Sequence, residues 1–242
     1  MIPKKIHYIW LGGNDLPDIA VKCIDSWKKF CPDYEIIRWD ESNLDLNKFQ
    51  FALDAYNAKK FAFASDVFRF DILKEHGGIY LDIDVELYKG LDDFLDKDFF
   101  TGFENRDYVA PGLIMGSIPN HKILDSMLEE YRKETFDAEN LKTVCVIMTE
   151  YLENKCALKS NGKTQKLCNG ITVYSKDYFC PKDSLTGKIK QSKNTYSIHH
   201  YYASWTKPNS KFFIFKARIK RFFKRLIGKK RYAKLKKFFG RG

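Results

Sequence analysis

The segment that most constrains the fold is a helix, a glycine pair and an alternating strand, in that order. Residues 54–76 place apolar side chains at helical spacing and predict a helix, which the glycines at 77–78 end. In residues 79–87, isoleucine, leucine and valine alternate with tyrosine, aspartate and glutamate. This alternation predicts a strand with one apolar and one polar face. A helix leading directly into such a strand indicates a sheet with helices packed on it.

The N-terminal residues favour the same architecture. Residues 6–10 are rich in β-branched and aromatic side chains and predict a strand that ends at a turn. Pro17 suits the first turn of a helix that reaches Phe30, and residues 34–39 predict a second strand. This β-α-β order predicts an α/β fold with a parallel sheet. A chain of 242 residues has room for one such domain and a small appendage.

Composition narrows the class of protein. Apolar residues make up 44% of the chain and aromatic residues 16%, which excludes disorder over most of it. No apolar run reaches about 18 residues, so no membrane-spanning helix is predicted. The first residues lack the apolar run of a secretory signal. The six cysteines form no Cys-x-x-Cys pair, which favours reduced thiols in the cytoplasm, with a secreted, disulfide-bonded protein as the alternative.

The net charge of +11 comes from the C-terminus. Residues 211–242 hold 14 lysines and arginines and no acid, whereas residues 1–210 hold 28 basic and 31 acidic residues and sum to −3. Phenylalanine, leucine and isoleucine recur at helical spacing in this tail, which predicts a basic amphipathic helix on an anionic membrane surface. The alternatives are a helix folded onto the catalytic domain and a nucleic-acid-binding tail.

The paired acids of the predicted strand are candidates for chemistry. Asp82 and Asp84 are two residues apart, so both side chains project from one side. Carboxylates placed so closely suit a hard divalent cation such as Mn²⁺ or Mg²⁺, at the carboxyl end of a strand. The alternative is an edge-strand pair facing water. A second pair, Asp96 and Asp98, has a lysine between its acids and is interpreted as a solvated loop.

Several stretches together resemble one enzyme family. They are FASDVFR at 63–69 with KEHGGIYLDID at 74–84, IPKKIHYIWLGG at 2–13, CIDSWK at 23–28, and IHHYYASW at 198–205. Taken in chain order across residues 2–205, they resemble the DXD-type retaining glycosyltransferases of family 32, which include capsular-polysaccharide and yeast-type mannosyl transferases. They are also similar to the catalytic domain of the large glucosylating toxins. The resemblance implies a GT-A fold over residues 1–210, a nucleotide-sugar donor and Mn²⁺ or Mg²⁺.

The resemblance also implies roles for individual residues. Asp84 would ligate the metal directly, and Asp82 would contact the donor and reach the metal through water. His200 is the expected third ligand, with His199 close behind. Asp66 and Arg69, at i and i+3 of a helix, would hold hydroxyls of the transferred sugar; the alternative is a simple intrahelical ion pair.

The remaining implied contacts concern the nucleotide and the diphosphate. Trp10 would stack on the base, although a core tryptophan is an equally good interpretation of the sequence alone. Gly12 and Gly13 would let the backbone approach the nucleotide closely. Leu11 is expected to contact the nucleotide beside them, and Tyr80 could reach the nucleotide or the ribose. Further along the chain, the signature ending in Ser204 and Trp205 would contact the diphosphate.

The predicted function is a metal-dependent retaining transfer of a hexose, with UDP-sugar preferred over GDP-sugar, to a glycan or lipid-linked glycan in surface polysaccharide synthesis. The expected place is the cytoplasmic face of the membrane, with residues 211–242 on the lipid and no nucleic-acid partner. Front-face attack is favoured over a nucleophile, for which Glu104 and Asp107 are the only nearby candidates. The alternatives are a toxin-like protein glycosyltransferase and a non-catalytic binding module.

Overall fold

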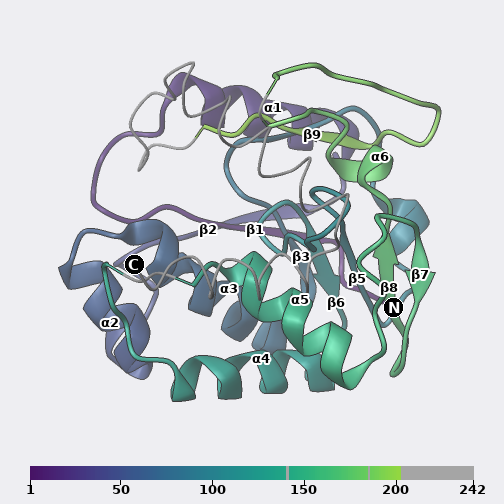
Figure 1. Ribbon diagram of the computed structural model, residues 1–242. Helices are drawn as coiled ribbons and strands as arrows, with labels where there is room; N and C mark the ends of the chain where they lie inside the picture. The colour runs from purple at the N-terminus through teal and green to yellow at the C-terminus, as the bar shows by residue number, and fades with distance from the viewer. Residues whose placement is uncertain (140–141, 185, 203–242) are drawn as a thin grey trace. The chain divides into compact units, whose positions relative to one another are not determined.

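A mixed sheet of seven strands forms the centre of the protein in the computed structural model, which describes residues 1–139, 142–184 and 186–202 (Figure 1). Its strands are β1 (Lys5–Ile9), β2 (Glu35–Trp39), β3 (Gly78–Tyr80), β5 (Phe99–Gly102), β6 (Met115–Ser117), β7 (Gln165–Lys166) and β8 (Ile171–Tyr174). The spatial order is β2-β1-β3-β6-β5-β8-β7. β1 pairs parallel with β2 and β3, β5 pairs parallel with β8, and β6 and β7 are antiparallel to their neighbours. The α/β architecture is confirmed.

Helices cover both faces of this sheet. They are α1 (Asp18–Phe30), α2 (Gln50–Asn57), α3 (Phe61–His76), α4 (Lys122–Lys133), α5 (Val144–Lys155) and α6 (Lys176–Phe179), with short 3₁₀ turns at Leu46–Lys48 and Asp92–Phe94. Figure 1 shows α2 to α5 on one face, and on the other α1 and a two-stranded sheet of β4 (Val85–Leu87) and β9 (Ser197–His199). None of the helices in the described part of the chain is long and apolar enough to cross a membrane.

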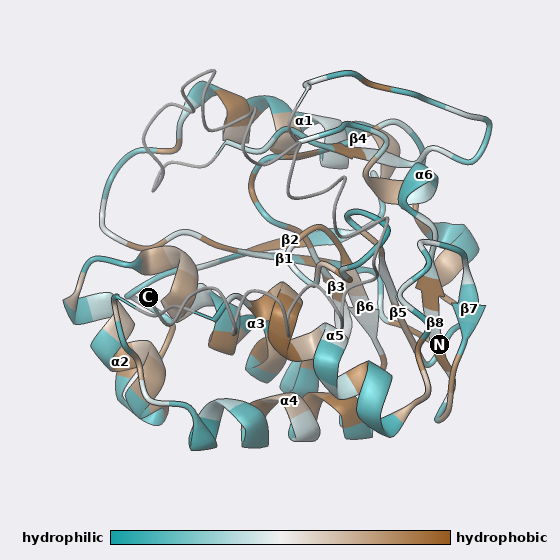
Figure 2. Ribbon diagram, in the orientation of Figure 1, coloured by the Kyte–Doolittle hydropathy of each residue, from teal (hydrophilic) through white to brown (hydrophobic). Residues whose placement is uncertain are grey.

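Two apolar clusters hold these layers together. One joins the α2–α5 layer to the sheet, and the other packs α1 and the small sheet on the opposite face. In Figure 2, α3 is mostly apolar whereas α4 alternates between apolar and hydrophilic residues. The difference follows from position, because α3 is covered on several sides and α4 has an outer face in water. The central sheet is therefore covered by apolar packing on both faces.

The single helix predicted for residues 54–76 is wrong. The chain forms α2 and α3 with a break between them, where Lys59 takes a φ of 56°. A lysine in the left-handed region cannot continue a helix, so the apolar spacing that spans the break belongs to two helices. The predicted stop is confirmed: Gly77, at a φ of 61°, caps α3, and its amide donates to the Leu73 carbonyl. A Cβ on Gly77 would lie 2.7 Å from Pro119 Cδ.

The continuous strand predicted for residues 79–87 is also wrong. β3 ends at Tyr80, a turn follows, and β4 begins at Val85 and joins the two-stranded sheet. The amide of Val85 donates to the Asp82 carbonyl over 3.0 Å, which closes the turn. The alternation in sequence is real, but two short strands in different sheets share it. The turn between them carries both aspartates.

The expectation of reduced cysteines needs one correction. Cys156 and Cys168 form a disulfide that encloses the loop before β8. Cys23, Cys31 and Cys180 are free and buried, and Cys145 is free and partly exposed. The spacing of the joined cysteines matches no motif, so sequence alone could not pair them.

Candidate functional site

The two aspartates of the turn lie beyond the carboxyl end of β3, as expected for a ligand site in an α/β sheet. The amide of Asp82 donates to the Gly112 carbonyl over 2.9 Å, which fixes the turn against the loop before β6. Asp84 is buried, while the Asp82 side chain keeps 29% of its surface exposed. One carboxylate is thus held by the protein and the other faces the open side of the site.

A histidine from the other end of the chain completes this group. Pairing of β4 with β9 sets His199 opposite Val85 and therefore next to Asp84. One ligand atom from each of Asp82, Asp84 and His199 lies within 4.8 Å of the others. His199 Nε2 is 3.1 Å from Asp84 Oδ1. Strand pairing, rather than sequence proximity, assembles these three side chains.

The electrostatics of Asp84 and His199 are linked. Burial alone would raise the pKa of Asp84, but the charge of His199, its hydrogen bond and the Tyr202 amide hold the pKa below its usual value. The Tyr202 amide donates to Asp84 Oδ2 over 2.7 Å. Burial would lower the pKa of His199, and Asp84 instead raises it well above its usual value. Without a cation, the two form a buried ion pair.

The geometry does not bring His200, the expected third ligand, to the aspartates. Its Nε2 lies 2.7 Å from Glu86 Oε2, and its backbone amide donates to the Asp84 carbonyl. β9 ends at His199, and the His200 side chain that follows it lies on the other side, against Glu86. Lys22 also pairs with Glu86, at 3.0 Å. Of the two histidines considered from sequence, His199 is the one in position.

Asp66 and Arg69 do form the ion pair that the sequence suggested, and the pair is part of the same site. Arg69 Nη2 is 2.7 Å from Asp66 Oδ1 and 3.6 Å from Asp82 Oδ1. Both side chains are almost completely buried. Burial raises the pKa of Asp66 to about 7, although Arg69 opposes the shift. Tyr80 packs its ring under the Arg69 guanidinium and donates its hydroxyl to Asp82 Oδ1 over 3.1 Å.

Residues that the sequence did not single out shape this pair. Gly112 lies against both charged groups: a Cβ there would be 2.2 Å from Asp82 Oδ2 and 2.4 Å from Arg69 Nη1. The Val144 amide, at the start of α5, donates to Asp66. For the contact of Gly112, the only signal in the sequence is the Pro111–Gly112 pair. For the hydrogen bond from the Val144 amide, the sequence contains no signal.

Two buried polar atoms in the described residues have no hydrogen-bond partner, and both belong to this site. They are side-chain atoms, the hydroxyl of Tyr131 and His199 Nδ1, although the His199 ring also interacts with the Cys180 thiol. Tyr131 comes from α4, and the strongest charges acting on it are those of Asp66 and Arg69. Buried polar atoms are normally paired, so unpaired ones mark places where a ligand or water completes the structure.

The proposed nucleotide side lies at the end of β1. Trp10 is half-buried, and its indole N–H donates to the Asn14 carbonyl over 2.7 Å. The side chain of Leu11 is buried in the apolar core, so only its backbone is available to a ligand. Gly12 takes a φ of 100°, and its amide donates to Glu41 Oε1. Glu41 was not predicted; it also accepts the Tyr56 hydroxyl.

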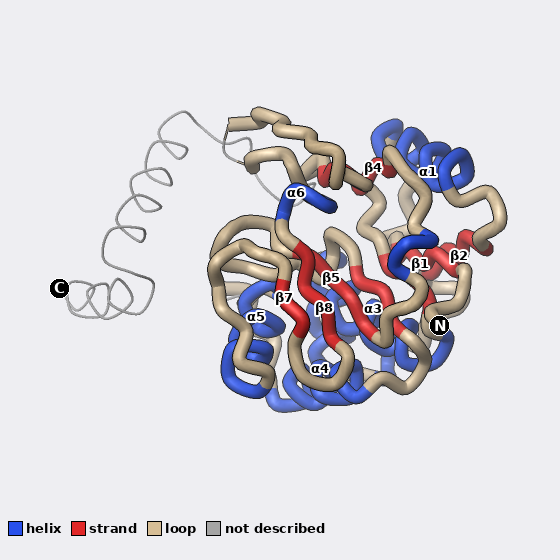
Figure 3. Tube along the Cα trace, turned by 90° about the vertical axis from the view of Figure 1, so that its right-hand side faces the viewer, coloured by secondary structure: helices blue, strands red, loops and turns tan. Residues whose placement is uncertain are grey.

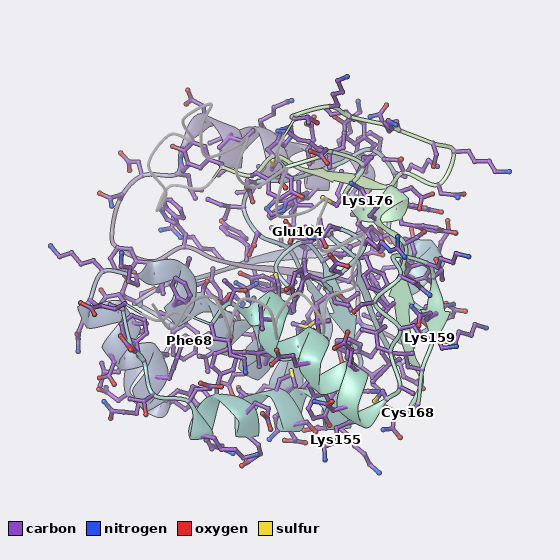
Figure 4. All side chains as sticks on the ribbon, viewed as in Figure 1. Phe68, Glu104, Lys155, Lys159, Cys168 and Lys176 are labelled. Atoms are coloured by element: carbon purple, nitrogen blue, oxygen red, sulfur yellow. A yellow bond between two sulfur atoms is a disulfide. The ribbon has the colours of Figure 1, made fainter. Side chains whose placement is uncertain are left out.

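The alternative nucleophiles differ in position. Glu104 is hydrogen-bonded to the Tyr201 hydroxyl and is the strongest charge acting on Cys145, which also interacts with Asp66 and Arg69 (Figure 4). Asp107 lies in the turn that follows, where its amide donates to Asn105. Ser204, Trp205 and the tail at 211–242 lie outside the described residues.

The residues present fit a divalent cation. Two carboxylates and one imidazole offer oxygen and nitrogen donors at one point, with His199 Nε2 3.1 Å from Asp84 Oδ1. Mn²⁺ accepts imidazole more readily than Mg²⁺ does, because Mg²⁺ prefers oxygen ligands.

Comparisons with known proteins agree with this geometry. Residues 17–101 match the sequence model of a family described as "Glycosyltransferase sugar-binding region containing DXD motif". The "Uncharacterized glycosyltransferase L373" of Acanthamoeba polyphaga mimivirus is 30% identical over 220 residues, which cover 85% of this chain and 84% of that protein. The range matched by the family model includes Asp66, Arg69, Asp82 and Asp84.

Two further proteins are similar over shorter ranges. The "Mannosyl phosphorylinositol ceramide synthase CSH1" of Saccharomyces cerevisiae is 32% identical over 154 residues, 56% of this chain. The match spans only 38% of the yeast protein. Among solved structures, "PaToxG Glycosyltransferase" superimposes with a TM-score of 0.50 at 21% identity, covering 64% of this chain and 70% of that one. This last similarity concerns the fold.

Proposed function

Because this chain belongs to the DXD-containing glycosyltransferases, we propose that it transfers a hexose from a nucleotide sugar to a glycan acceptor with the help of Mn²⁺ or Mg²⁺. The observation that supports this proposal best is the meeting of Asp82, Asp84 and His199 beside the Asp66–Arg69 pair. A cation group and a buried charged pair at one strand end offer contacts for a diphosphate and for sugar hydroxyls at the same time.

Each side chain has a distinct task in this proposal. Asp66 and Arg69 hold the hydroxyls of the transferred sugar and fix its orientation, because their own pairing and burial leave them little freedom. Asp82, the more exposed carboxylate, faces the donor, while Asp84 and His199 anchor the cation from the protein side. A bound divalent cation supplies positive charge for the departing diphosphate.

Retention of the anomeric configuration is the expected stereochemistry. In front-face attack the leaving phosphate accepts the acceptor proton, so no carboxylate nucleophile is needed. Of the two candidate nucleophiles, Glu104 is favoured, since its charge acts on Cys145, which also interacts with Asp66 and Arg69. A Glu104→Gln variant separates the routes: front-face attack predicts retained transfer, and a glycosyl-enzyme intermediate predicts its loss.

The donor base follows from the nucleotide side. We prefer UDP, with the half-buried Trp10 ring beside the base and Gly12 at the backbone. The mannosyl transferases among the relatives make a GDP-sugar the alternative. A thermal-shift panel of UDP- and GDP-sugars with Mn²⁺ distinguishes them, because a ligand that binds only the folded state raises the melting temperature.

The proposed acceptor is a glycan or lipid-linked glycan of a surface polysaccharide. The name of the yeast relative includes a ceramide lipid, which supports an acceptor at a membrane. The basic residues at 211–242 would hold the enzyme to the cytoplasmic face of that membrane.

Donor hydrolysis tests the proposal. The purified full chain with Mn²⁺ should release nucleoside diphosphate from the donor found in the panel. Asp84→Ala should abolish this activity, and Asp96→Ala, from the second Asp-x-Asp pair, should keep it, because Asp96 is exposed and pairs with Lys97. Equal activity in the wild type and Asp84→Ala, or none in the wild type with any donor, would contradict the proposal.

A further inference from the structure

Charge is divided unevenly along the described chain. Residues 1–154 contain 18 basic and 29 acidic residues, a net charge of −11. Residues 155–193 contain nine lysines and two aspartates, a net charge of +7. This segment precedes the basic tail and is separate from it. An acidic body with one basic segment has a field that orients it toward an anionic partner.

The basic segment gathers on one face. It contains β7, β8, α6 and the loop after residue 188, all on the side of the protein turned to the viewer in Figure 3. Figure 4 shows Lys159 and Lys176 on the right-hand side of the molecule and Lys155 at its lower edge. We call this the lysine face and define it by Lys155, Lys159, Lys163, Lys166, Lys176, Lys190 and Lys193.

The lysines of this face form no ion pair with a carboxylate in the described part of the chain, although the charge of Lys166 acts on Asp96. Among the ion pairs of the described residues, none involves a member of the lysine face. Elsewhere lysines are commonly paired, as Lys48 is with Asp71 and Glu75. Like charges that lack counter-charges repel one another, so this face gains stability when an anionic partner supplies them.

A hollow lies within the lysine face. Its volume is about 510 Å³, and Lys159, Lys163 and Lys166 line it together with Asn161 and Thr164. Gln165 organises the loop, because its side-chain amide donates to the carbonyls of Lys159 and Lys163. Ammonium groups with amide and hydroxyl donors around a hollow of this size suit a phosphate-bearing headgroup.

An exposed apolar side chain accompanies the lysines. Ile189 stands between Lys188 and Lys190 and is 49% exposed; among the large apolar residues of the described chain, only Met1 is more exposed. A β-bridge between Ile189 and Lys182 fixes its backbone. In proteins that bind to membrane surfaces, exposed apolar side chains flanked by lysines insert between the lipid headgroups and the acyl chains. Ile189 has this exposure and these neighbours.

We propose that the lysine face docks on an anionic lipid bilayer, with phosphate headgroups against its lysines, one of them in the hollow, and Ile189 in the interfacial layer. This surface lies on the catalytic domain and is additional to the tail. It does not depend on the proposed function, because it uses none of Asp66, Arg69, Asp82, Asp84 or His199.

A lipid surface fits these observations better than a nucleic acid. Proteins that bind single strands combine basic grooves with exposed aromatic rings for base stacking. On the lysine face, Tyr174 and Phe179 are buried, and the exposed large apolar side chain is aliphatic. RNA binding is therefore the competing outcome of the test.

Vesicle flotation of the full chain tests the proposal. The wild type should bind phosphatidylcholine vesicles that contain phosphatidylserine, and should bind pure phosphatidylcholine weakly. A triple variant, Lys159→Gln, Lys163→Gln and Lys166→Gln, should lower the partition coefficient about a hundredfold, since each lysine near the surface contributes several-fold. The tail is present in every protein compared and does not affect the ratio.

A matched triple variant controls for net charge. Lys28→Gln, Lys29→Gln and Lys133→Gln remove the same charge from exposed helical positions outside the lysine face and should change binding far less. Ile189→Ser should weaken binding several-fold, and Ile189→Leu should not. Circular dichroism and melting temperatures of both triple variants should match the wild type, because the three lysine-face residues are exposed and form no ion pair within the described residues, and the control lysines form only exposed i,i+3 ion pairs there.

Three results would overturn the proposal. The first is a partition coefficient of the lysine-face variant equal to that of the wild type or of the control. The second is no binding of wild type to anionic vesicles. The third is binding of a single-stranded RNA that the lysine-face variant loses while vesicle binding persists. If inorganic phosphate alone raises the melting temperature of the wild type and vesicles do not bind, the hollow takes free phosphate rather than a membrane.

Discussion

Gly112 and Asp82 are in direct contact through both backbone and side chain. The Gly112 carbonyl accepts the Asp82 amide over 2.9 Å, and the space where a Cβ would stand lies 2.2 Å from Asp82 Oδ2. The same space is 2.4 Å from Arg69 Nη1. Because Gly112 has no side chain, the Asp82 carboxylate and the Arg69 guanidinium can both lie against its backbone. This close approach joins the proposed sugar contacts to the proposed cation group.

We expect Gly112→Ala to reduce donor hydrolysis at least about a hundredfold, because the methyl group displaces Asp82 and Arg69 together and misplaced catalytic groups cost roughly that much. Steady-state kinetics with and without added Mn²⁺ provide the measurement. Gly116→Ala serves as the control: its Cβ would lie 2.0 Å from Phe100 Cε1, in the core. It should lower the melting temperature and leave the KM for donor unchanged. Normal activity of Gly112→Ala would contradict the role given to this contact.

The sequence predicted the α/β class and the cluster around Asp82 because both depend on local pattern. Apolar periodicity, a glycine stop and two acids at a strand end are readable without tertiary contacts. The error over residues 79–87 has a physical reason. Alternation of apolar and polar residues shows the direction of the side chains, but it does not show whether the residues form one strand or two strands in different sheets. The split between α2 and α3 was missed because Lys59 gives no signal for a positive φ.

The parts of the site that sequence could not give come from long-range pairing. His199 reaches Asp84 because β9 pairs with β4, and the register of that pairing decides between His199 and His200. The position of α5 brings the Val144 amide to Asp66, and the position of α4 brings the Tyr131 hydroxyl near the same carboxylate. These contacts join segments far apart in sequence, so no local pattern encodes them.

The two histidines give a direct test of the strand register. We expect His199→Ala to raise the Mn²⁺ concentration needed for half-maximal donor hydrolysis by at least about tenfold, since a ligand or its orienting partner is lost. His200→Ala should change it much less, because that ring pairs with Glu86. Manganese titration of activity, supported by paramagnetic resonance of free Mn²⁺, measures both. A larger effect at His200 would restore the expectation from sequence.

Tyr131 offers a prediction in which stability and binding move in opposite directions. Its hydroxyl is buried without a partner, so Tyr131→Phe should raise the free energy of unfolding by about 1 kcal/mol. The same change should weaken donor binding several-fold, because a sugar hydroxyl or a bridging water beside Asp66 loses its contact. Urea denaturation and donor titration by thermal shift measure the two effects. A variant that gains stability and binds donor normally would show that the hydroxyl has no part in binding.

His7 makes folding sensitive to acid at a place away from the site. It is buried in β1, where its Nδ1 accepts the Trp39 indole N–H over 3.1 Å and its Nε2 therefore donates to the Gly77 carbonyl. Burial lowers the pKa of His7 from 6.5 to about 4, and the neighbouring His76 and Lys5 act in the same direction. The fold thus requires a neutral imidazole at this position.

This requirement predicts a loss of stability at acid pH. Between about pH 6.5 and pH 4 the unfolded chain binds a proton at His7 that the folded chain does not, so the free energy of unfolding falls as pH falls through this range. From about pH 7 to about pH 5 the loss from His7 alone is about 2 kcal/mol. In His7→Gln, whose amide can both accept from Trp39 and donate to Gly77 without titrating, this part of the loss should disappear. Urea denaturation of both proteins at the two pH values measures the difference, in which the other titrating groups cancel. If the free energies of unfolding of wild type and His7→Gln fell equally between the two pH values, His7 would bind its proton as readily in the folded as in the unfolded chain. In that case the hydrogen bond from Trp39 would not hold the ring in the neutral form.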